Sequence, residues 1–283
     1  MATATRGRKQ ARGPSVVRAI AATFVEHNLL TYAAAIAFQG LVALIPMTLL
    51  GLGVLGATGN RSVWTDRIGP AIEGRVTAPV YSGIDHTVRR ILEHGTGGLI
   101  AFSAALSLWY LTAAMRAVIE ALNRIHDVDD DRSWLHRIAI AVGLGLASGA
   151  SLYGAAVLVI AGPRGVALGL LRWIGAIALL TLVVGLLVRY APAERPETSW
   201  ASLGAVLVIA SWIVASLLFR LWVTYVADFR TPIGSLATLL VLTSYLFVST
   251  TVFLAGVQLD ELLRKRHPAG LRLVDHVRAV LGR

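Results

Sequence analysis

The chain has 283 residues, of which 56% are hydrophobic and only 15% charged, and its mean hydropathy is +0.69. Soluble domains carry roughly 25% charged residues, so this composition excludes an ordinary water-soluble domain and favours a protein embedded in lipid. The sequence contains no cysteine, which excludes disulfides and thiol nucleophiles, and its net charge of +10 indicates contact with an anionic membrane surface.

Residues 1–28 are expected to form a cytoplasmic, basic and amphipathic segment. Val17, Ile20 and Phe24 share one helical face, and basic residues such as Arg18 flank it. The apolar stretch is too short for the core of a secretory signal, so no cleaved signal peptide is predicted.

The sequence predicts an all-α membrane protein with six transmembrane helices. A crossing helix needs about 20 mostly apolar residues. The segments that meet this length are Leu29–Ala57, Gly98–Ile119, Ile138–Ala161, Val166–Val188, Trp200–Thr224 and Ile233–Leu259. They make up a transmembrane domain over 29–259, which a basic cytoplasmic tail over 260–283 follows.

The distribution of Lys and Arg predicts that both termini face the cytoplasm. With this orientation, 16 of the 26 basic residues lie on the cytoplasmic side, 7 on the outer side and 3 within spans. Short cytoplasmic connections of membrane proteins usually carry such an excess. We therefore expect a multi-pass membrane protein with both ends on the cytoplasmic side.

The stretch GLGVLG, Gly51 to Gly56, has the glycine spacing of dinucleotide-binding loops. In those loops the glycines open a soluble helix that holds a phosphate at its N-terminus. Here a polar turn and Pro70 follow instead. We interpret the glycines as positions of close packing in a spanning helix.

Further glycines and one proline of the predicted spans should affect the packing and shape of the helices. Gly145 with Gly149, and Gly165 with Gly169, have the small-residue spacing of close helix–helix contacts. Pro46 should kink the first span because it removes a backbone donor. The kink is either a simple bend or part of a moving gate.

The long connection 58–97 predicts amphipathic helices on the outer side of the membrane. Its apolar residues recur about every four positions, with prolines as breaks. The positions are Trp64, Ile68, Ile72 and Val76, then Ile84, Val88 and Ile91 or Leu92, with the breaks at Pro70 and Pro79. These helices either cap the bundle or form a lid over a cavity.

The acidic run DVDDD, Asp127 to Asp131, has the first spacings of a calcium-binding loop. Arg132 stands where that loop needs glycine, and Ile138 where it needs glutamate. The alternative is a solvated loop in which an Asp and Ser133 cap the next helix. The seven histidines and the serines show no metal-binding or catalytic spacing, so we expect no metal, no cofactor and no enzymatic activity.

Arginines inside the predicted spans are the best candidates for a binding site. Arg116 lies near the cytoplasmic end of the second span, and Arg172 and Arg220 lie toward the outer ends of the fourth and fifth. Snorkelling to the interface would explain all three. A sharper hypothesis joins Arg172, Arg220 and Arg230 in a site for an anionic headgroup, with Asp228 as an ion-pair partner when the site is empty.

The C-terminal tail places Arg264, Lys265 and Arg266 directly after the last span, and an apolar stripe over 273–281 follows. Each basic side chain near an anionic surface contributes on the order of 1 kcal/mol to membrane binding. We expect the basic termini to bind anionic lipid headgroups. Nucleic acid is not an expected partner, because aromatic residues are not interleaved with the basic ones.

Three segments resemble the YihY/BrkB family of bacterial inner-membrane proteins, in its YhjD-like branch. They are AAAIAFQGLVALIPMTLL in the first span, ALNRIHDVDDDRSWLHRI between spans two and three, and the stretch from RYAPAERPETSW to TPIGSLATLLVLTSYLFVSTTVFLAGVQLDELL. The resemblance covers about residues 15–265 and includes Asn123, Arg132, Gly234 and Gly256 as motif positions.

The resemblance implies a six-helix inner-membrane protein with both ends inside and a role in envelope integrity, serum resistance or lipid export. An old label, ribonuclease BN, also accompanies the family, but a hydrolytic metal cluster is missing from this sequence. Phe38 and Ala43 depart from the family pattern, and Gln258 stands where the family often has an acid.

Three functional hypotheses follow. The chain moves or accommodates an anionic lipid or other amphiphile, with Pro46 as a flexible point and the outer arginines at the headgroup. Alternatively, it is a non-transporting scaffold that forms homo-oligomers or binds envelope proteins. The third hypothesis, an RNA-processing enzyme, has no support from its residues. The sequence contains no nucleotide-hydrolysing motif, so transport would be passive or ion-coupled.

Overall fold

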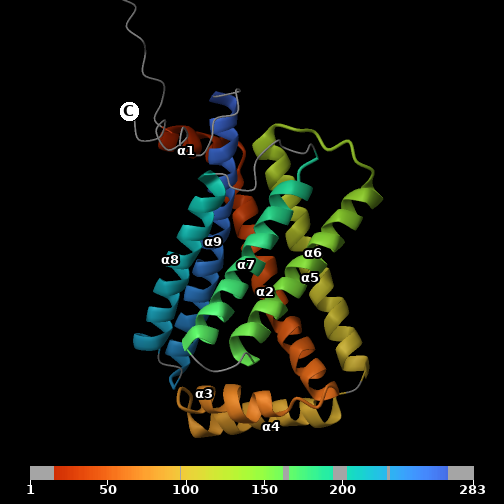
Figure 1. The fold of residues 1–283 in the computed structure, drawn as a ribbon, viewed down its shortest axis with the longest axis vertical. Helices are drawn as coiled ribbons and strands as arrows, with labels where there is room; N and C mark the ends of the chain where they lie inside the picture. Colours follow the sequence, from red (N-terminus) through yellow and green to blue (C-terminus); the bar gives the residue numbers. More distant parts are fainter. Residues whose placement is uncertain (1–15, 96, 162–165, 194–202, 228–229, 267–283) are drawn as a thin grey trace, which may run out of the picture.

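Long helices form a bundle with a short helix across one end and a helical cap across the other (Figure 1). The computed structural model describes residues 16–95, 97–161, 166–193, 203–227 and 230–266. Its elements are α1 (Val16–Glu26), α2 (Leu29–Ala57), the π-helical turn η1 (Trp64–Ile68), α3 (Gly69–Glu73), α4 (Ala78–His94), α5 (Gly97–His126), α6 (Trp134–Ala161), α7 (Val166–Tyr190), α8 (Leu203–Tyr225) and α9 (Pro232–Arg266).

The long apolar segments form the membrane-spanning helices. In the described part of the chain, six helices are long and apolar enough to cross a membrane: α2 and α5 to α9. Helix α2 has the predicted bounds, whereas α5 continues past Ile119 to His126 and α9 continues past Leu259 to Arg266. The prediction of an all-α, multi-pass membrane protein is confirmed.

The two ends of the bundle have different structures. At one end, here named the α1 end, α1 lies across the bundle beside the last turns of α9 (Figure 1). At the other, here named the cap end, α3 and α4 lie across the ends of the long helices (Figure 1). The first described helix and the last described turn of the chain therefore lie at the same end.

Helix α2 occupies the centre of the bundle, where it packs against α5, α9 and α4. Helix α6 packs on α5, and α7 in turn packs on α6. On the other side, α8 packs on α9. Helices α7 and α8 are thus the first and last members of a series of packed helices that does not close into a ring. The main packing partner of α7 is α6 and that of α8 is α9, so neither packs mainly on the other.

The apolar core is concentrated toward the α1 end. One cluster takes buried residues from α1, α2 and α5 to α9, and it includes Phe24, Leu29, Ala33, Ala114, Leu122, Ala141, Val184, Val208 and Leu254. The N-terminal amphipathic helix contributes Phe24, while Ile20 packs against the same cluster. The alanines allow helices to approach closely, and such packing stabilises helix association in lipid.

The glycines of GLGVLG lie where other helices approach α2. A Cβ at Gly53 would stand 2.8 Å from the Ile100 side chain of α5, and one at Gly56 would stand 2.8 Å from the backbone oxygen of Leu92 in α4. The packing interpretation of these glycines is therefore confirmed.

The other predicted glycine contacts have mixed outcomes. Gly149 of α6 faces Leu111 of α5, as expected for a close contact. Gly165 lies outside the described residues. Among the described residues, only the Arg172 side chain of its own helix lies near the Cβ position of Gly169, at 4.0 Å, so the predicted helix–helix contact is wrong for this part of the chain. The reason is that α7 at this level lies apart from α8.

The helices predicted for the 58–97 connection exist and pack on the end of α2. Trp64, Val88 and Leu92 form a small core with Leu52 and Leu55 of α2. The prolines predicted as breaks stand instead in the first turns of α3 and α4, where the missing N–H costs no helical hydrogen bond. The apolar faces of this connection thus close the cap end of the central helix.

Polar contacts fix the geometry of the cap. The indole N–H of Trp64 donates to Asp85 Oδ1 at 2.8 Å, and Arg89 Nε donates to Asp85 Oδ2 at 2.7 Å. These hydrogen bonds lower the pKa of Asp85, first through Arg89 and then through Trp64. Arg67 of η1 also donates to the backbone oxygen of Ile160, which attaches the cap to α6.

Candidate functional site

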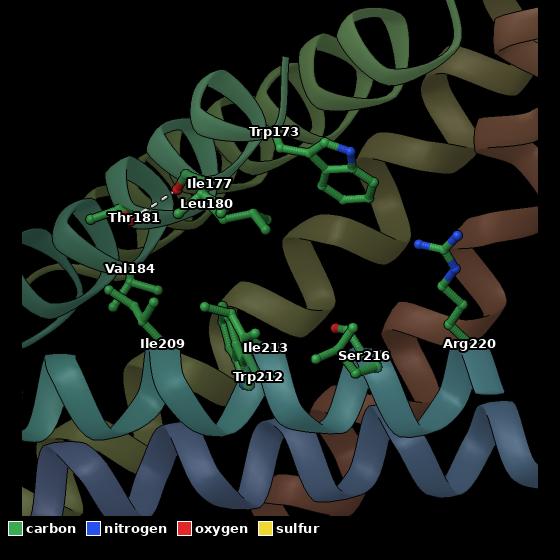
Figure 2. Close-up of a pocket in the computed structure, with 11 residues that line it drawn as sticks. Trp173, Ile177, Leu180, Thr181, Val184, Ile209, Trp212, Ile213, Ser216 and Arg220 are labelled. Carbon is green, nitrogen blue, oxygen red and sulfur yellow. Dashed lines mark hydrogen bonds between the residues drawn. The ribbon is translucent and has the colours of Figure 1, made fainter. Parts of the chain in front are cut away.

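A groove between α7 and α8 is the main candidate site (Figure 2). Its volume is about 310 Å³. Most of the lining is apolar and comes from both helices: Trp173, Ile177, Leu180, Val184, Ile209, Trp212, Ile213 and Leu217. The polar lining residues are Thr181, Ser216 and Arg220.

The packing of the bundle explains why this groove is open. Val184 and Val208 belong to the buried core, so the two helices meet toward the α1 end. From Val184 and Ile209 the helices diverge toward Trp173 and Arg220 (Figure 2). Since α7 rests on α6 and α8 rests on α9, neither helix fills the space between them.

The polar groups of the groove are mostly engaged with their own helices or with α9. Thr181 donates to the Ile177 backbone oxygen at 2.8 Å, and Ser216 Oγ lies 2.9 Å from Tyr245 Oη. The guanidinium of Arg220 stands at the wide end of the groove (Figure 2). The groove therefore offers an apolar slot with a cationic group at one end.

The structure distributes the predicted headgroup residues over three places. Arg220 lines the groove, and Arg172 directly precedes the lining residue Trp173 on α7. Arg230 donates to the backbone oxygen of Gly74 at 3.4 Å and so contacts the cap. Asp228 lies outside the described residues.

Pro46 is buried within α2, which continues as one helix from Leu29 to Ala57. The hydroxyl of Tyr153 on α6 donates to the backbone oxygen of Met47, next to the proline. Thr48 donates back to Leu44 O at 2.7 Å. These side chains supply polar contacts to the backbone around the proline, which explains how the helix tolerates it in an apolar environment.

Asn123 and Arg132 form part of a polar clamp at the α1 end, in which the side chain of Asp130 is the common partner. Asn123 Oδ1 accepts from the backbone N–H of Ala193 at 2.8 Å, and its Nδ2 donates to Asp130 at 3.3 Å. Arg132 donates from Nε to Asp130 Oδ1 at 2.9 Å and from Nη2 to the Ala191 oxygen at 3.0 Å. The clamp joins the end of α5, the connection before α6 and the segment after α7.

Electrostatics keep Asp130 ionised in this clamp. Burial raises the pKa of its carboxyl, but hydrogen bonds and positive charge from Arg132, and charge from Arg137, outweigh that effect and leave the pKa below its ordinary value. Ser133 Oγ accepts from the backbone N–H of His136 at 3.4 Å, so the predicted cap of α6 is confirmed.

The sequence profile of the virulence factor BrkB family matches residues 20–278. The chain belongs to this family. It is similar to the ribonuclease-like protein YfkH of Bacillus subtilis (strain 168), with 24% identity over 267 residues that cover 89% of this chain and 96% of that protein. No solved structure matches the chain. The family predicted from sequence is confirmed, and no branch within it is distinguished.

Two further motif positions of this BrkB-family chain have structural roles. A Cβ at Gly256 would stand 2.8 Å from the backbone oxygen of Gly204, so these glycines mark the close crossing of α9 and α8. Asp260, one turn later, accepts from the backbone N–H of Gly204 at 2.7 Å. Gly234 donates its N–H to Thr231 Oγ1 at 3.1 Å, which caps the start of α9.

A buried carboxylate at the α1 end was not predicted. Glu261 is 1% exposed, and its Oε2 lies 2.9 Å from His126 Nδ1 on α5. Arg264 donates to both carboxylate oxygens, at 2.9 and 2.7 Å. The partners Glu261 and His126 are 135 positions apart, so no local spacing indicates the pair.

The neighbouring charges continue this network to the surface. Lys265 Nζ donates to Asp127 Oδ2 at 2.6 Å, and Asp127 Oδ1 lies 3.6 Å from His27 Nε2. Lys265, which the sequence suggested for lipid headgroups, thus has a carboxylate partner within the protein. The apolar stripe of the tail lies outside the described residues.

Two aspartates of the acidic run have structural partners. Asp127 pairs with Lys265 and Asp130 pairs with Arg132. Within the described ranges, no group of three or more His, Asp or Glu side chains could hold a metal ion. Gln258, which replaces the acid frequent in the family, is buried in α9.

Proposed function

We propose that this BrkB-family membrane protein accommodates an anionic amphiphile, most simply a lipid, in the α7/α8 groove and moves it between the membrane leaflets. The observation that supports this proposal is the form of the groove, which combines an apolar lining with Arg220 at its wide end. An acyl chain fits the lining, and an anionic headgroup fits the guanidinium.

The length of the groove suits one leaflet. Eleven residues separate Ile209 from Arg220, which corresponds to about 16 Å along a helix. Half of the hydrocarbon core measures about 15 Å. The closed apolar end would therefore lie near the bilayer midplane, while Arg220 would lie near the headgroup level, where a charged side chain costs little.

Several further elements belong to the same proposal. Both termini lie in the cytoplasm, so the cap end and Arg220 face outward. Pro46 gives the central helix a point of flexibility, and Arg172 and Arg230 add positive charge near the wide end. The protein acts in the cell envelope as a transporter without enzymatic activity, and its basic termini contact anionic lipids.

The proposal is tested by lipid exchange in vesicles that contain the purified protein. Headgroup-labelled phosphatidylglycerol is placed in the bilayer, and its exposure to an impermeant quencher is followed over time. The wild type should speed exchange between leaflets. Arg220→Ala should slow it about fivefold, which corresponds to the roughly 1 kcal/mol that a basic side chain contributes near an anionic surface.

A matched pair of variants tests the groove itself. Thr181→Phe places a phenyl ring in the slot and should block exchange, whereas Leu182→Phe adds the same ring at the next position, which does not line the groove. If folded wild-type protein leaves exchange of every lipid class unchanged, transport is excluded. A non-transporting scaffold would then be favoured, and co-purifying envelope proteins would support it.

The name of the Bacillus subtilis relative suggests RNA processing as an alternative activity. We do not adopt it, because Asp127 and Asp130 of the acidic run are engaged in ion pairs with basic side chains of the chain itself. Metal-dependent nuclease activity that follows the purified protein, and that is lost on substitution of these aspartates, would reverse this judgement.

A further inference from the structure

A second cavity lies at the α1 end, far along the bundle from Arg220. Its volume is about 400 Å³, and α2, α5, the 127–133 connection and α6 all contribute to its lining. Its polar lining consists of Tyr32, Arg116, Glu120, Asp130, Trp134 and Arg137. We refer to it as the α5/α6 pocket.

The charges around the α5/α6 pocket leave Arg116 available and Arg137 only loosely paired, with its Nε 3.9 Å from Asp130 Oδ2. Glu120 lies 3.5 Å from Arg124, and Asp130 is held at 2.9 Å by Arg132. The carboxylates of the pocket thus already have partners outside the lining. Arg116 on α5 and Arg137 on α6 then present positive charge from two walls of one cavity.

Arg116 is the more informative of the two. It lies in the spanning helix α5 toward its α1 end, where an anionic partner at the headgroup level would compensate its charge. Among the described residues it has no hydrogen-bond or ion-pair partner, whereas Arg137 donates to the Arg132 backbone oxygen at 3.2 Å. A guanidinium in this position is well placed for an anion from outside the protein.

The surroundings indicate that this anion belongs to a lipid. Trp134 borders the pocket at the first residue of α6 and is 66% exposed, and Leu135 beside it is 71% exposed. Exposed tryptophan at the start of a spanning helix is typical of the headgroup level of a bilayer. The start of α6 also directs its positive dipole end toward this level.

We propose that the α5/α6 pocket binds the phosphate group of an anionic glycerophospholipid from the leaflet at the α1 end. Arg116 and Arg137 contact the phosphate from opposite walls, and the indole N–H of Trp134 is available as a third donor. This site is independent of the α7/α8 groove, because it shares no lining residue with it and lies at the other end of the bundle.

The test uses the full chain in detergent and measures lipid binding by native mass spectrometry. Phosphatidylglycerol and phosphatidylcholine with the same acyl chains are titrated separately. The wild type should bind the first phosphatidylglycerol more tightly than the first phosphatidylcholine. Arg116→Ala should weaken phosphatidylglycerol binding about fivefold. It should weaken phosphatidylcholine binding less, because the choline cation of that lipid already opposes the attraction between its phosphate and the guanidinium.

Matched variants separate charge from folding. Arg116→Lys keeps the positive charge and should stay within about twofold of the wild type, whereas Arg116→Gln keeps much of the length and should behave as Arg116→Ala does. Arg90→Ala removes an exposed arginine of α4 at the cap end and should change nothing. Unchanged phosphatidylglycerol affinity in both Arg116→Ala and Arg116→Gln would overturn the proposal.

A soluble phosphate is the other source of the same chemistry. Millimolar glycerol phosphate should fail to displace bound phosphatidylglycerol if the lipid is the ligand. Displacement, or equal wild-type affinity for the two lipids, would overturn the lipid assignment. Loss of exchange in Arg220→Ala with intact phosphatidylglycerol binding would show that the two sites act separately, which supports the proposed pocket.

Discussion

Replacement of Arg132 should weaken the α1 end of the bundle, and the contacts of its side chain set the size of the effect. Arg132→Ala removes hydrogen bonds of 2.9 and 3.2 Å to the two oxygens of Asp130 and one of 3.0 Å to Ala191 O. Loss of one partner of a buried ion pair costs about 3–5 kcal/mol. Asp130 keeps the Asn123 amide and a backbone N–H, so we expect a loss of about 2–4 kcal/mol in the free energy of unfolding.

The measurement is unfolding of the purified protein in mixed detergent, followed by tryptophan fluorescence. Arg124→Ala serves as the control, because the exposed pair with Glu120 contributes less than about 1 kcal/mol. Asp130→Asn and the double variant complete a double-mutant cycle. The summed losses of unfolding free energy in the two single variants should exceed the loss in the double variant by about 1–3 kcal/mol. Strictly additive costs, or an Arg132→Ala effect no larger than the control, would refute the role of the clamp.

Three further outcomes follow from the structure. The pKa of Asp130 lies below its ordinary value of 3.8, so its ion pair should stabilise the fold above about pH 4 and lose that contribution as the pH falls below 3.8. The free energy of unfolding, measured at a series of pH values, should therefore fall less steeply in acid for Arg132→Ala than for the wild type. Gly56→Ala should destabilise the fold by about 1–3 kcal/mol, because the rigid backbone of Leu92 faces the new Cβ. Gly40→Ala should stabilise it by about 0.5–1 kcal/mol, because no atom of the described residues lies within 4 Å of the new Cβ. Thermal unfolding in detergent compares the two variants. Asp85→Ala should leave the indole of Trp64 without its acceptor and increase hydrogen exchange in α4 but not in α9, while Asp85→Asn should restore most of the protection.

The sequence was sufficient for the spanning helices and for the cap because both depend on local composition. Runs of about 20 apolar residues predict crossing helices wherever they occur. The four-residue periodicity from Trp64 to Leu92 likewise predicted amphipathic helices, since one face meets protein and the other meets a polar environment. Ser133 could be assigned as a helix cap for the same local reason.

The candidate site could not be predicted in this way, because lipid-facing and core-facing surfaces of a spanning helix are both apolar. In α8, Val208 is 1% exposed and its neighbour Leu207 is 42% exposed, yet nothing in their chemistry distinguishes them. The groove depends on which helices pack together, and Arg220 became a lining residue only through that packing. The pair of His126 and Glu261 joins positions 135 residues apart and has no local pattern at all.

The connections of the bundle suggest where the groove can widen. Helices α7 and α8 converge at the α1 end, where Val184 and Val208 share the core and Asn123 holds the backbone of Ala193. Toward Trp173 and Arg220 the same helices diverge (Figure 2), while α7 rests on α6 and α8 rests on α9. Because the fixed contacts lie at one end, separation of the two helix pairs would open the groove at the Arg220 end and leave the α1 end intact. A lipid headgroup that enters beside Arg220 would therefore meet little resistance from the core.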